Sequence, residues 1–306
     1  MKRLLLVANP AASGFTGGMF RTITSMLASS YSIEPAWPIS PDEARQVAGQ
    51  AAADGVDVVV AFGGDGVVHQ VANGVAGTST ALGIIPAGTT NVYARILGIP
   101  GRPRKAAELL TGETHQIAAP LARVEVGDPP VKSFATFGTG VGYDAGVVER
   151  SEGQPYRKYW FGSVHYARSA VSALLSDYRT MKPHLRVSDG DRKVDAVTVL
   201  AQVHSPYTYF GKVPLGVPAG EGLTVIIFEK LPLRRAPGIL FRAMRSGDLE
   251  KSRGVHVWRD VEHLTIEADP EEATQADGEL LGRSGLIVIR FAPEAINVIV
   301  PPPDGD

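Results

Sequence analysis

Short apolar runs alternate with segments of helical spacing over the first third of the chain. The apolar runs, four to seven residues long, predict buried strands at 4–8, 56–62 and 82–85. Helical spacing predicts helices at 19–29, 67–76 and 92–97. A further helix is predicted after Ser40, where a serine cap is followed by proline and two acidic residues. Fully apolar strands interleaved with helices indicate a parallel sheet that is covered on both faces.

The pattern changes after about residue 118. Strands now outnumber helices and are predicted at 121–126, 133–137, 184–187, 194–203, 223–228, 264–267 and 286–291. One helical segment, 159–176, interrupts them. Because glycine and proline punctuate these strands, this half is predicted to be an antiparallel sandwich. The expected domains are 1–118 and 119–292, with 293–306 returning to the first domain.

Composition narrows the class of protein. The 306 residues suffice for two domains, and 44% hydrophobic with 20% charged residues is typical of a soluble globular protein. The net charge of −2 gives no support to nucleic-acid binding. The chain has no cysteine, which excludes cysteine-ligated metals and thiol catalysis and fits a cytoplasmic location. No apolar run approaches the roughly 20 residues of a membrane span, so any membrane contact is expected to be peripheral.

Three polar or glycine-rich loops follow predicted strands, and they begin at Asn9, Gly63 and Pro86. Ligands of parallel sheets bind at the carboxyl ends of the strands, so these loops are expected to converge. Gly63-Gly64-Asp65-Gly66 joins a strand to a helix, which is how many α/β proteins hold phosphate. Asp65 would then act through a metal ion or a nearby hydroxyl. The alternative is a plain turn between strand and helix.

Four motifs occur in order along the chain. They are Gly63-Gly64-Asp65-Gly66, Pro86-Ala87-Gly88-Thr89-Thr90-Asn91 with Ala94-Arg95, Phe137 to Ala145, and Asp277-Gly278-Glu279. Together they resemble the diacylglycerol kinase catalytic family, which includes bacterial lipid kinases and sphingosine kinases. The resemblance implies an α/β plus β fold. Its N-terminal part is a three-layer α/β domain with a parallel sheet, of the NAD kinase and diacylglycerol kinase type. Its C-terminal part is an antiparallel β-sandwich domain that receives the lipid.

The resemblance also implies ATP and Mg²⁺ as cofactors. The residues that it assigns to nucleotide binding are Asn9, Pro10, Ser13, Gly14, Ser40, Gly63, Gly64, Asp65, Gly66, Val67, Thr89 and Asn91. Thr89 and Asn91 could instead only cap the helix that follows them, although capping and phosphate binding are compatible. A structural magnesium site in the second domain would involve Pro218, Glu221 and Leu223. For that segment, a surface turn is an equally good interpretation.

Phosphoryl transfer to a lipid hydroxyl is helped by a carboxylate that takes the proton. The resemblance assigns this role to Glu279, with Asp277 and Asp65 as rivals. An ordinary hairpin turn remains the alternative for Asp277-Gly278-Glu279, because Asp-Gly is a favoured turn pair.

Two segments mix basic and apolar side chains, 156–161 and 230–245. Such segments favour anionic lipid surfaces, and a solvated face with core-packed apolar residues is the alternative. The expected partner is therefore a lipid substrate, with peripheral contact at the inner face of the membrane. A homodimer is compatible with the sequence.

The chain departs from the family pattern at five positions. Val67 stands where threonine is usual, Val92 and Pro120 where aspartate is usual, Phe15 where lysine is frequent, and Glu221 where the metal ligand is usually aspartate. Two alternatives to an ATP-dependent lipid kinase therefore stay open. One is an NAD kinase-like enzyme, and the other is a catalytically weak regulator that binds lipid or nucleotide.

Overall fold

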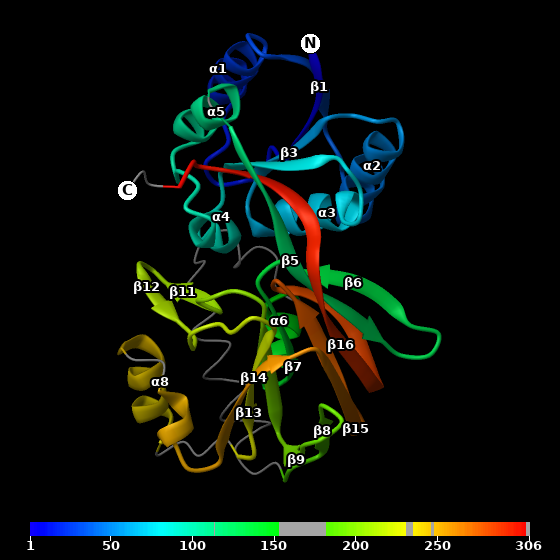
Figure 1. Cartoon of the computed structure of the whole chain (residues 1–306), viewed down its shortest axis with the longest axis vertical. Helices are drawn as coiled ribbons and strands as arrows, with labels where there is room; N and C mark the ends of the chain where they lie inside the picture. Colours follow the sequence, from blue (N-terminus) through cyan, green and yellow to red (C-terminus); the bar gives the residue numbers. More distant parts are fainter. Residues whose placement is uncertain (113, 153–181, 231–234, 246–247, 304–306) are drawn as a thin grey trace. The chain divides into compact units, whose positions relative to one another are not determined.

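The computed structural model describes residues 1–112, 114–152, 182–230, 235–245 and 248–303 (Figure 1). The chain divides into two compact units, which comprise residues 1–121 with 293–306 and residues 122–292. The sequence places the boundary at 118/119 and the return at 293. Two long strands belong to both units, β5 (His115–Val126) and β16 (Glu279–Val300).

The first unit is built on a parallel sheet in the order β2-β1-β3-β4, with the end of β16 beside β4. Its strands are β1 (Lys2–Ala8), β2 (Tyr31–Ala36), β3 (Val58–Gly63) and β4 (Ala81–Pro86). Every residue of β3 and β4 is buried, which explains why these strands are apolar without interruption. Leu4 pairs with Val58, and Val58 pairs with Ala81, so the carboxyl ends of β1, β3 and β4 lie at one edge.

Helices cover this sheet, and four of them pack as two pairs. The helices are α1 (Gly17–Leu27), α2 (Pro41–Ala53), α3 (Asp65–Val75), α4 (Val92–Ile96) and α5 (Pro103–Thr111). Helix α1 packs on α5, α2 packs on α3, and the two pairs lie on opposite sides of β3 (Figure 1). Gly74 permits the close approach of α3 to α2, since a Cβ there would lie 2.6 Å from the Arg45 carbonyl oxygen. The predicted layers of helix, parallel sheet and helix are thus present.

The second unit is an antiparallel β-sandwich domain. Its main sheet has the order β14-β13-β10-β7-β15-β16, β8 and β9 extend from β15, β6 pairs with β5, and β11 pairs with β12. The strands are β6 (Val131–Ala135), β7 (Gly138–Gly142), β8 (Leu185–Ser188), β9 (Lys193–Ala196), β10 (Thr198–Gln202), β11 (Thr208–Phe210), β12 (Val213–Leu215), β13 (Leu223–Phe228), β14 (Val255–Val261) and β15 (His263–Ala276). Among the described residues of this unit, the helical elements are α6 (Tyr143–Glu152), α8 (Ala236–Arg245) and a 3₁₀ turn, Leu249–Lys251.

Several predicted elements need correction. The segment 194–203 forms two strands, β9 and β10. Strand β9 pairs with β8 and ends at Ala196, whereas β10 begins at Thr198 and pairs with β7 and β13. The strand predicted at 264–267 continues to Ala276 as β15, because a register shift between Glu267 and Glu272 leaves Pro270 outside the hydrogen-bonded pairing. Strand β2 was missed because it is a mostly exposed edge strand, and α5, β7 and β14 were missed as well. The predicted helix at 159–176 and the segment 156–161 lie outside the described residues.

Candidate functional site

The three loops predicted to converge do meet at the carboxyl edge of the parallel sheet. The Asn9 N–H donates to the Phe62 carbonyl oxygen over 3.1 Å. The Gly14 N–H donates to the Ala87 carbonyl oxygen over 2.8 Å, and the Ala87 N–H donates to the Gly63 carbonyl oxygen over 2.7 Å. Backbone groups therefore fasten the first and second loops to the third.

Glycine is required where the second and third loops touch. A Cβ on Gly88 would lie 2.6 Å from the Gly64 Cα, and a Cβ on Gly64 would lie 3.3 Å from the Gly88 Cα. The Gly64 backbone is extended, with φ of −95°, so positive φ is not the reason for glycine at this position. The sequence predicts glycines that allow close approach and positive φ, and only the first of these properties is used between Gly64 and Gly88.

The third loop is closed by Asn91. The Gly88 N–H donates to Asn91 Oδ1 over 3.0 Å, and Asn91 Nδ2 donates to the Gly88 carbonyl oxygen over 2.8 Å. Asn91 has φ of 50°, a left-handed conformation that asparagine tolerates better than most residues. Its side chain makes no capping bond to α4, so the loop rather than the helix uses the amide. Thr89 is exposed between these two residues.

Asp65 begins α3 and reaches the start of α4. Its Oδ1 accepts a hydrogen bond from the Tyr93 N–H over 3.4 Å. The carboxylate thus lies near the N-termini of two helices, where negative charge is favoured. The first N–H groups of a helix have no carbonyl partner four residues earlier, so α3 also offers donors to a phosphate. The Val67 N–H is not among them, because it donates to the Gly64 carbonyl oxygen over 3.1 Å. Asp65 thus contacts the start of α4, and its contact with a metal ion stays a prediction.

The remaining predicted nucleotide residues lie around this edge. Ser40 caps α2 by accepting from the Glu43 N–H over 3.2 Å, as the sequence predicts for the helix start. Ser13 Oγ donates weakly to the Ala87 carbonyl oxygen over 3.5 Å. The Val67 side chain covers Gly63, where an added Cβ would lie 2.8 Å from Val67 Cγ2.

Phe15, at the position where lysine is frequent in the family, joins an aromatic group at the end of the first loop. Its ring centroid lies 5.3 Å from that of Phe62 and 5.9 Å from that of Trp37. Phe20 completes the group, 4.5 Å from Trp37. An apolar ring therefore replaces a cation beside the loops.

In the second unit, Asp277-Gly278-Glu279 forms the turn of the β15–β16 hairpin, so the hairpin interpretation is right for its backbone. Asp277 and Gly278 have φ of 53° and 85°. The Asp277 carboxylate is buried and accepts four hydrogen bonds from one neighbouring segment. The donors are the Thr136 N–H at 2.6 Å, Thr136 Oγ1 at 2.9 Å, the Phe137 N–H at 3.0 Å and the Gly138 N–H at 3.2 Å.

Two further contacts hold this turn beside β7. The Gly278 N–H donates to Gln275 Oε1 over 2.7 Å, and Gln275 Nε2 donates to the Tyr207 hydroxyl over 2.8 Å. Tyr207 packs on Gly138, where a Cβ would lie 2.6 Å from the tyrosine ring. Glu279 is half-buried at the first position of β16. The position of Glu279 is therefore set by a fixed turn.

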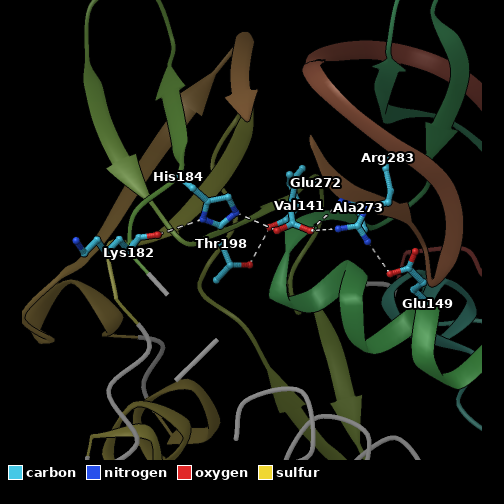
Figure 2. A network of polar contacts seen from close by, with 8 residues as sticks. All are labelled: Val141, Glu149, Lys182, His184, Thr198, Glu272, Ala273 and Arg283. Carbon is cyan, nitrogen blue, oxygen red and sulfur yellow. Dashed lines mark hydrogen bonds and ion pairs between the residues drawn. The ribbon is translucent and has the colours of Figure 1, made fainter. Parts of the chain in front are cut away.

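An ionic network centred on the buried Glu272 lies farther along the same hairpin (Figure 2). Glu272 on β15 accepts from Arg283 on β16 over 3.2 Å and contacts His184 Nε2 at 2.9 Å. Arg283 also donates to Glu149 on α6 over 2.9 Å. Burial works against the charged form of Glu272, but hydrogen bonds from His184 and the Ala273 N–H, with the charges of His184 and Arg283, outweigh it. The pKa of Glu272 therefore lies below its usual value.

The predicted metal segment packs on a residue that sequence reasoning missed. The Glu221 N–H donates to Asp260 Oδ1 over 2.7 Å, and a Cβ on Gly220 would lie 2.1 Å from the same oxygen. Carboxylate and carbonyl oxygens are the ligands that Mg²⁺ prefers, so the donor chemistry fits. Over the described ranges, however, no three acidic or histidine side chains gather closely enough to form a metal cluster.

A cavity of about 290 Å³ opens at the opposite, amino-terminal edge of the parallel sheet, among Lys2, Tyr31, Asp57 and Gln116. Burial, and then the charge of Asp57, raise the pKa of Tyr31. Because the three loops lie at the other edge, this cavity is separate from the candidate nucleotide site.

A glycine-loop α/β domain joined to an antiparallel β-sandwich domain defines the architecture of the diacylglycerol kinase-like enzymes. Residues 3–121 match the model of the diacylglycerol kinase catalytic domain, and residues 139–300 match that of the YegS C-terminal NAD kinase beta sandwich-like domain. The chain belongs to this diacylglycerol kinase family.

Relatives agree with the assignment. A diacylglycerol kinase of Mycobacterium tuberculosis (strain ATCC 25618 / H37Rv) is 35% identical over 170 residues, which cover 55% of this chain and 53% of the relative. The chain thus spans about half the length of that relative. A Staphylococcus haemolyticus protein whose name contains the words lipid kinase is 26% identical over 283 residues, covering 86% of this chain and 82% of that protein. A solved diacylglycerol kinase structure from Bacillus anthracis superposes with a TM-score of 0.71 at 18% identity, covering 98% and 97% of the two chains, and shows the shared fold.

Proposed function

We propose that this protein transfers the γ-phosphate of ATP to a hydroxyl of a diacylglycerol-like or sphingoid lipid. The observation that carries the proposal is the convergence of the three loops, fastened by the Gly14–Ala87 and Ala87–Gly63 hydrogen bonds. Backbone N–H groups at a helix start favour phosphate, and phosphoryl transfer depends mainly on positioning and charge stabilisation. Membership of a kinase family supports the same reaction class.

In this proposal the N–H groups of Gly63 to Gly66 hold phosphate oxygens. Val67, the last residue of the predicted loop, lies beside them with its N–H on the Gly64 carbonyl oxygen, and Asp65 contacts the start of α4. Asn9 to Gly14, Ser40, Thr89 and Asn91 complete the nucleotide contacts. Mg²⁺ would offset the charge of the triphosphate. A structural Mg²⁺ would be held by the carbonyl oxygens of Pro218 and Leu223 and the carboxylate of Glu221, next to Asp260.

The proton of the lipid hydroxyl goes to Glu279, and the hydroxyl oxygen bonds to the γ-phosphorus as the bond to the leaving ADP oxygen breaks. Asp277, one of the two rival carboxylates, is better suited to anchor the hairpin turn than to take a proton, because its oxygens already accept four hydrogen bonds. Asp65 Oδ1 already accepts a hydrogen bond from the Tyr93 N–H at the start of α4. We assign the base to Glu279 on these grounds together with its family motif.

The test is an assay of the purified chain with ATP, Mg²⁺ and a panel of diacylglycerols, sphingoid bases and NAD, with products identified by mass. The proposal expects one phosphorylated lipid class and no phosphorylated NAD. NADP as the product would establish the NAD kinase alternative, which the description of the second domain keeps open. Nucleotide binding without any product would instead favour the regulator, and it would contradict the proposal.

Because the proposed substrate is a lipid, we expect the protein to act at a membrane surface, which in our proposal is the inner face of the cell membrane. In the part of the chain that the structure describes, no helix has the length and apolar character needed to cross a bilayer.

A further inference from the structure

Helix α8 (Ala236–Arg245) carries apolar side chains on two faces. On one face, Ile239 and Ala243 pack against a buried cluster that includes Ile226 and Phe228. The core-packing interpretation of this segment is therefore right for one face only. On the other face, Leu240, Phe241 and Met244 remain 52%, 59% and 36% exposed. Leu231, Leu233 and Arg234, which belong to the same amphipathic stretch of sequence, lie outside the described residues.

The three exposed side chains form one stripe. At about 100° per residue, positions 240, 241 and 244 fall within roughly a third of the helix circumference. Single exposed apolar residues are common on protein surfaces, whereas a contiguous stripe marks a site of interaction. The stripe therefore needs a partner with an apolar interior.

Cations border this stripe. The helix contains Arg242 and Arg245 in its last turn and no acidic residue. The Arg245 guanidinium lies 5.9 Å from the centre of the Phe241 ring, so charge and apolar surface adjoin directly. Exposed Arg235 precedes the helix, and exposed Lys212 lies between β11 and β12, the latter of which packs on α8.

The nearby acidic side chains do not reverse this charge. Asp248 pairs with Lys251 at 2.6 Å, and Glu250 pairs with Arg259. Arg242 donates to the neutral Ser252 hydroxyl over 3.0 Å. A protein partner for such a surface would need matching acids, whereas a bilayer that contains anionic lipid supplies both negative headgroups and an apolar interior.

We propose that α8 docks on an anionic lipid membrane, inserting Leu240, Phe241 and Met244 among the acyl chains while Arg245 and Arg235 contact the headgroups. Long cationic side chains suit this position, because their stems lie along apolar surface while the charge stays in the polar layer. The inference deepens the proposed lipid kinase function and rests on it for its purpose. The docking itself involves neither ATP nor the glycine loops.

The experiment is flotation of the full chain with vesicles of phosphatidylcholine alone or mixed with phosphatidylglycerol, without ATP. We expect binding to the mixed vesicles that weakens as salt is raised. The double variant Leu240→Ser/Phe241→Ser should bind at least about tenfold more weakly, from the apolar area that it removes. Ile39→Ser, at an apolar residue of the other unit that is 96% exposed, should bind like the native chain.

Equal binding by the double variant and the native chain, or no preference for phosphatidylglycerol, would overturn the docking proposal. Arg245→Glu is an exposed substitution that tests the same surface if the double variant loses its thermal unfolding transition. A native dimer that the double variant converts to a monomer in sedimentation would assign the stripe to a second copy instead. Phosphorylation of short-chain lipid in detergent micelles is measured in parallel, so a failure of docking and a failure of the kinase reaction give different results.

Discussion

The loops of the first unit hold one another through backbone groups, whereas the turn of the second unit is held by a buried side chain. Gly14, Ala87 and Gly63 make their contacts through N–H and carbonyl groups. Asp277 makes its contacts through a carboxylate that reaches residues 136 to 138, some 140 positions earlier in the chain. The first arrangement suits a ligand that approaches the backbone closely, as phosphate does. The second suits a group whose position must be fixed.

Replacing the anchor of the turn should have the largest effect on stability. Asp277→Ala leaves the buried N–H groups of Thr136, Phe137 and Gly138 without their acceptor, which should cost on the order of 4 kcal/mol. Chemical denaturation would show the loss. Asp277→Asn keeps one acceptor oxygen and should cost less. If Asp277→Asn abolished turnover with unchanged stability, Asp277 would be the base rather than the anchor.

In the first unit, the matching substitution is Gly88→Ala. The added methyl group would lie 2.6 Å from the Gly64 Cα, so the second and third loops must separate. We expect ATP affinity to fall by about tenfold or more, equivalent to a strain of about 1–3 kcal/mol. Gly101→Ala is the control, because nothing lies within 4 Å of a Cβ there. Unchanged ATP affinity in Gly88→Ala would show that the contact between the loops is not needed for binding.

The ionic network around Glu272 predicts that the protein loses stability in acid. The folded state lowers the pKa of Glu272. The stabilisation that its ionised carboxylate gives is therefore complete above the pKa of the same group in the unfolded chain, about 4.3. This stabilisation is lost as the pH falls through the pKa of Glu272 in the folded protein. Glu272→Gln should flatten this part of the stability profile, measured by urea unfolding between neutral and acidic pH. Glu271→Gln, at an exposed neighbour, should leave the profile unchanged. A native profile without an acid slope that depends on Glu272 would contradict the account.

The smallest effect is expected at Val67. Val67→Thr restores the residue that is usual in the family with almost the same shape. Because the side chain at position 67 is only half-buried, the added hydroxyl should cost no more than about 1 kcal/mol, the low end of the cost of burying a hydroxyl. Turnover should rise by a few-fold if the hydroxyl adds a contact to the nucleotide, as initial rates would show. Val131→Thr, at an exposed apolar position, is the control. A large loss of turnover in Val67→Thr would mean that the apolar side chain over Gly63 is itself required.

The same contrast explains how far the sequence could predict the site. Gly63 to Gly66 and Pro86 to Asn91 follow apolar strands directly, so local pattern and sheet topology suffice to bring them together. The Asp277 contacts and the Asp260 contact with Glu221 join residues that are distant in sequence, and no periodicity signals them. The Asp-Gly pair predicts the hairpin turn but does not indicate which groups the Asp277 carboxylate binds. Edge strand β2 escaped prediction because it buries few of its residues.

The central claim is that the first unit binds ATP while Glu279 of the second takes the proton. It is tested most directly by measuring ATP affinity and lipid phosphorylation together in Glu279→Gln. The account predicts unchanged ATP affinity and a fall in turnover of about 100- to 10,000-fold, the usual contribution of a general base. Glu271→Gln should retain both properties. Turnover at the native rate in Glu279→Gln would contradict the account.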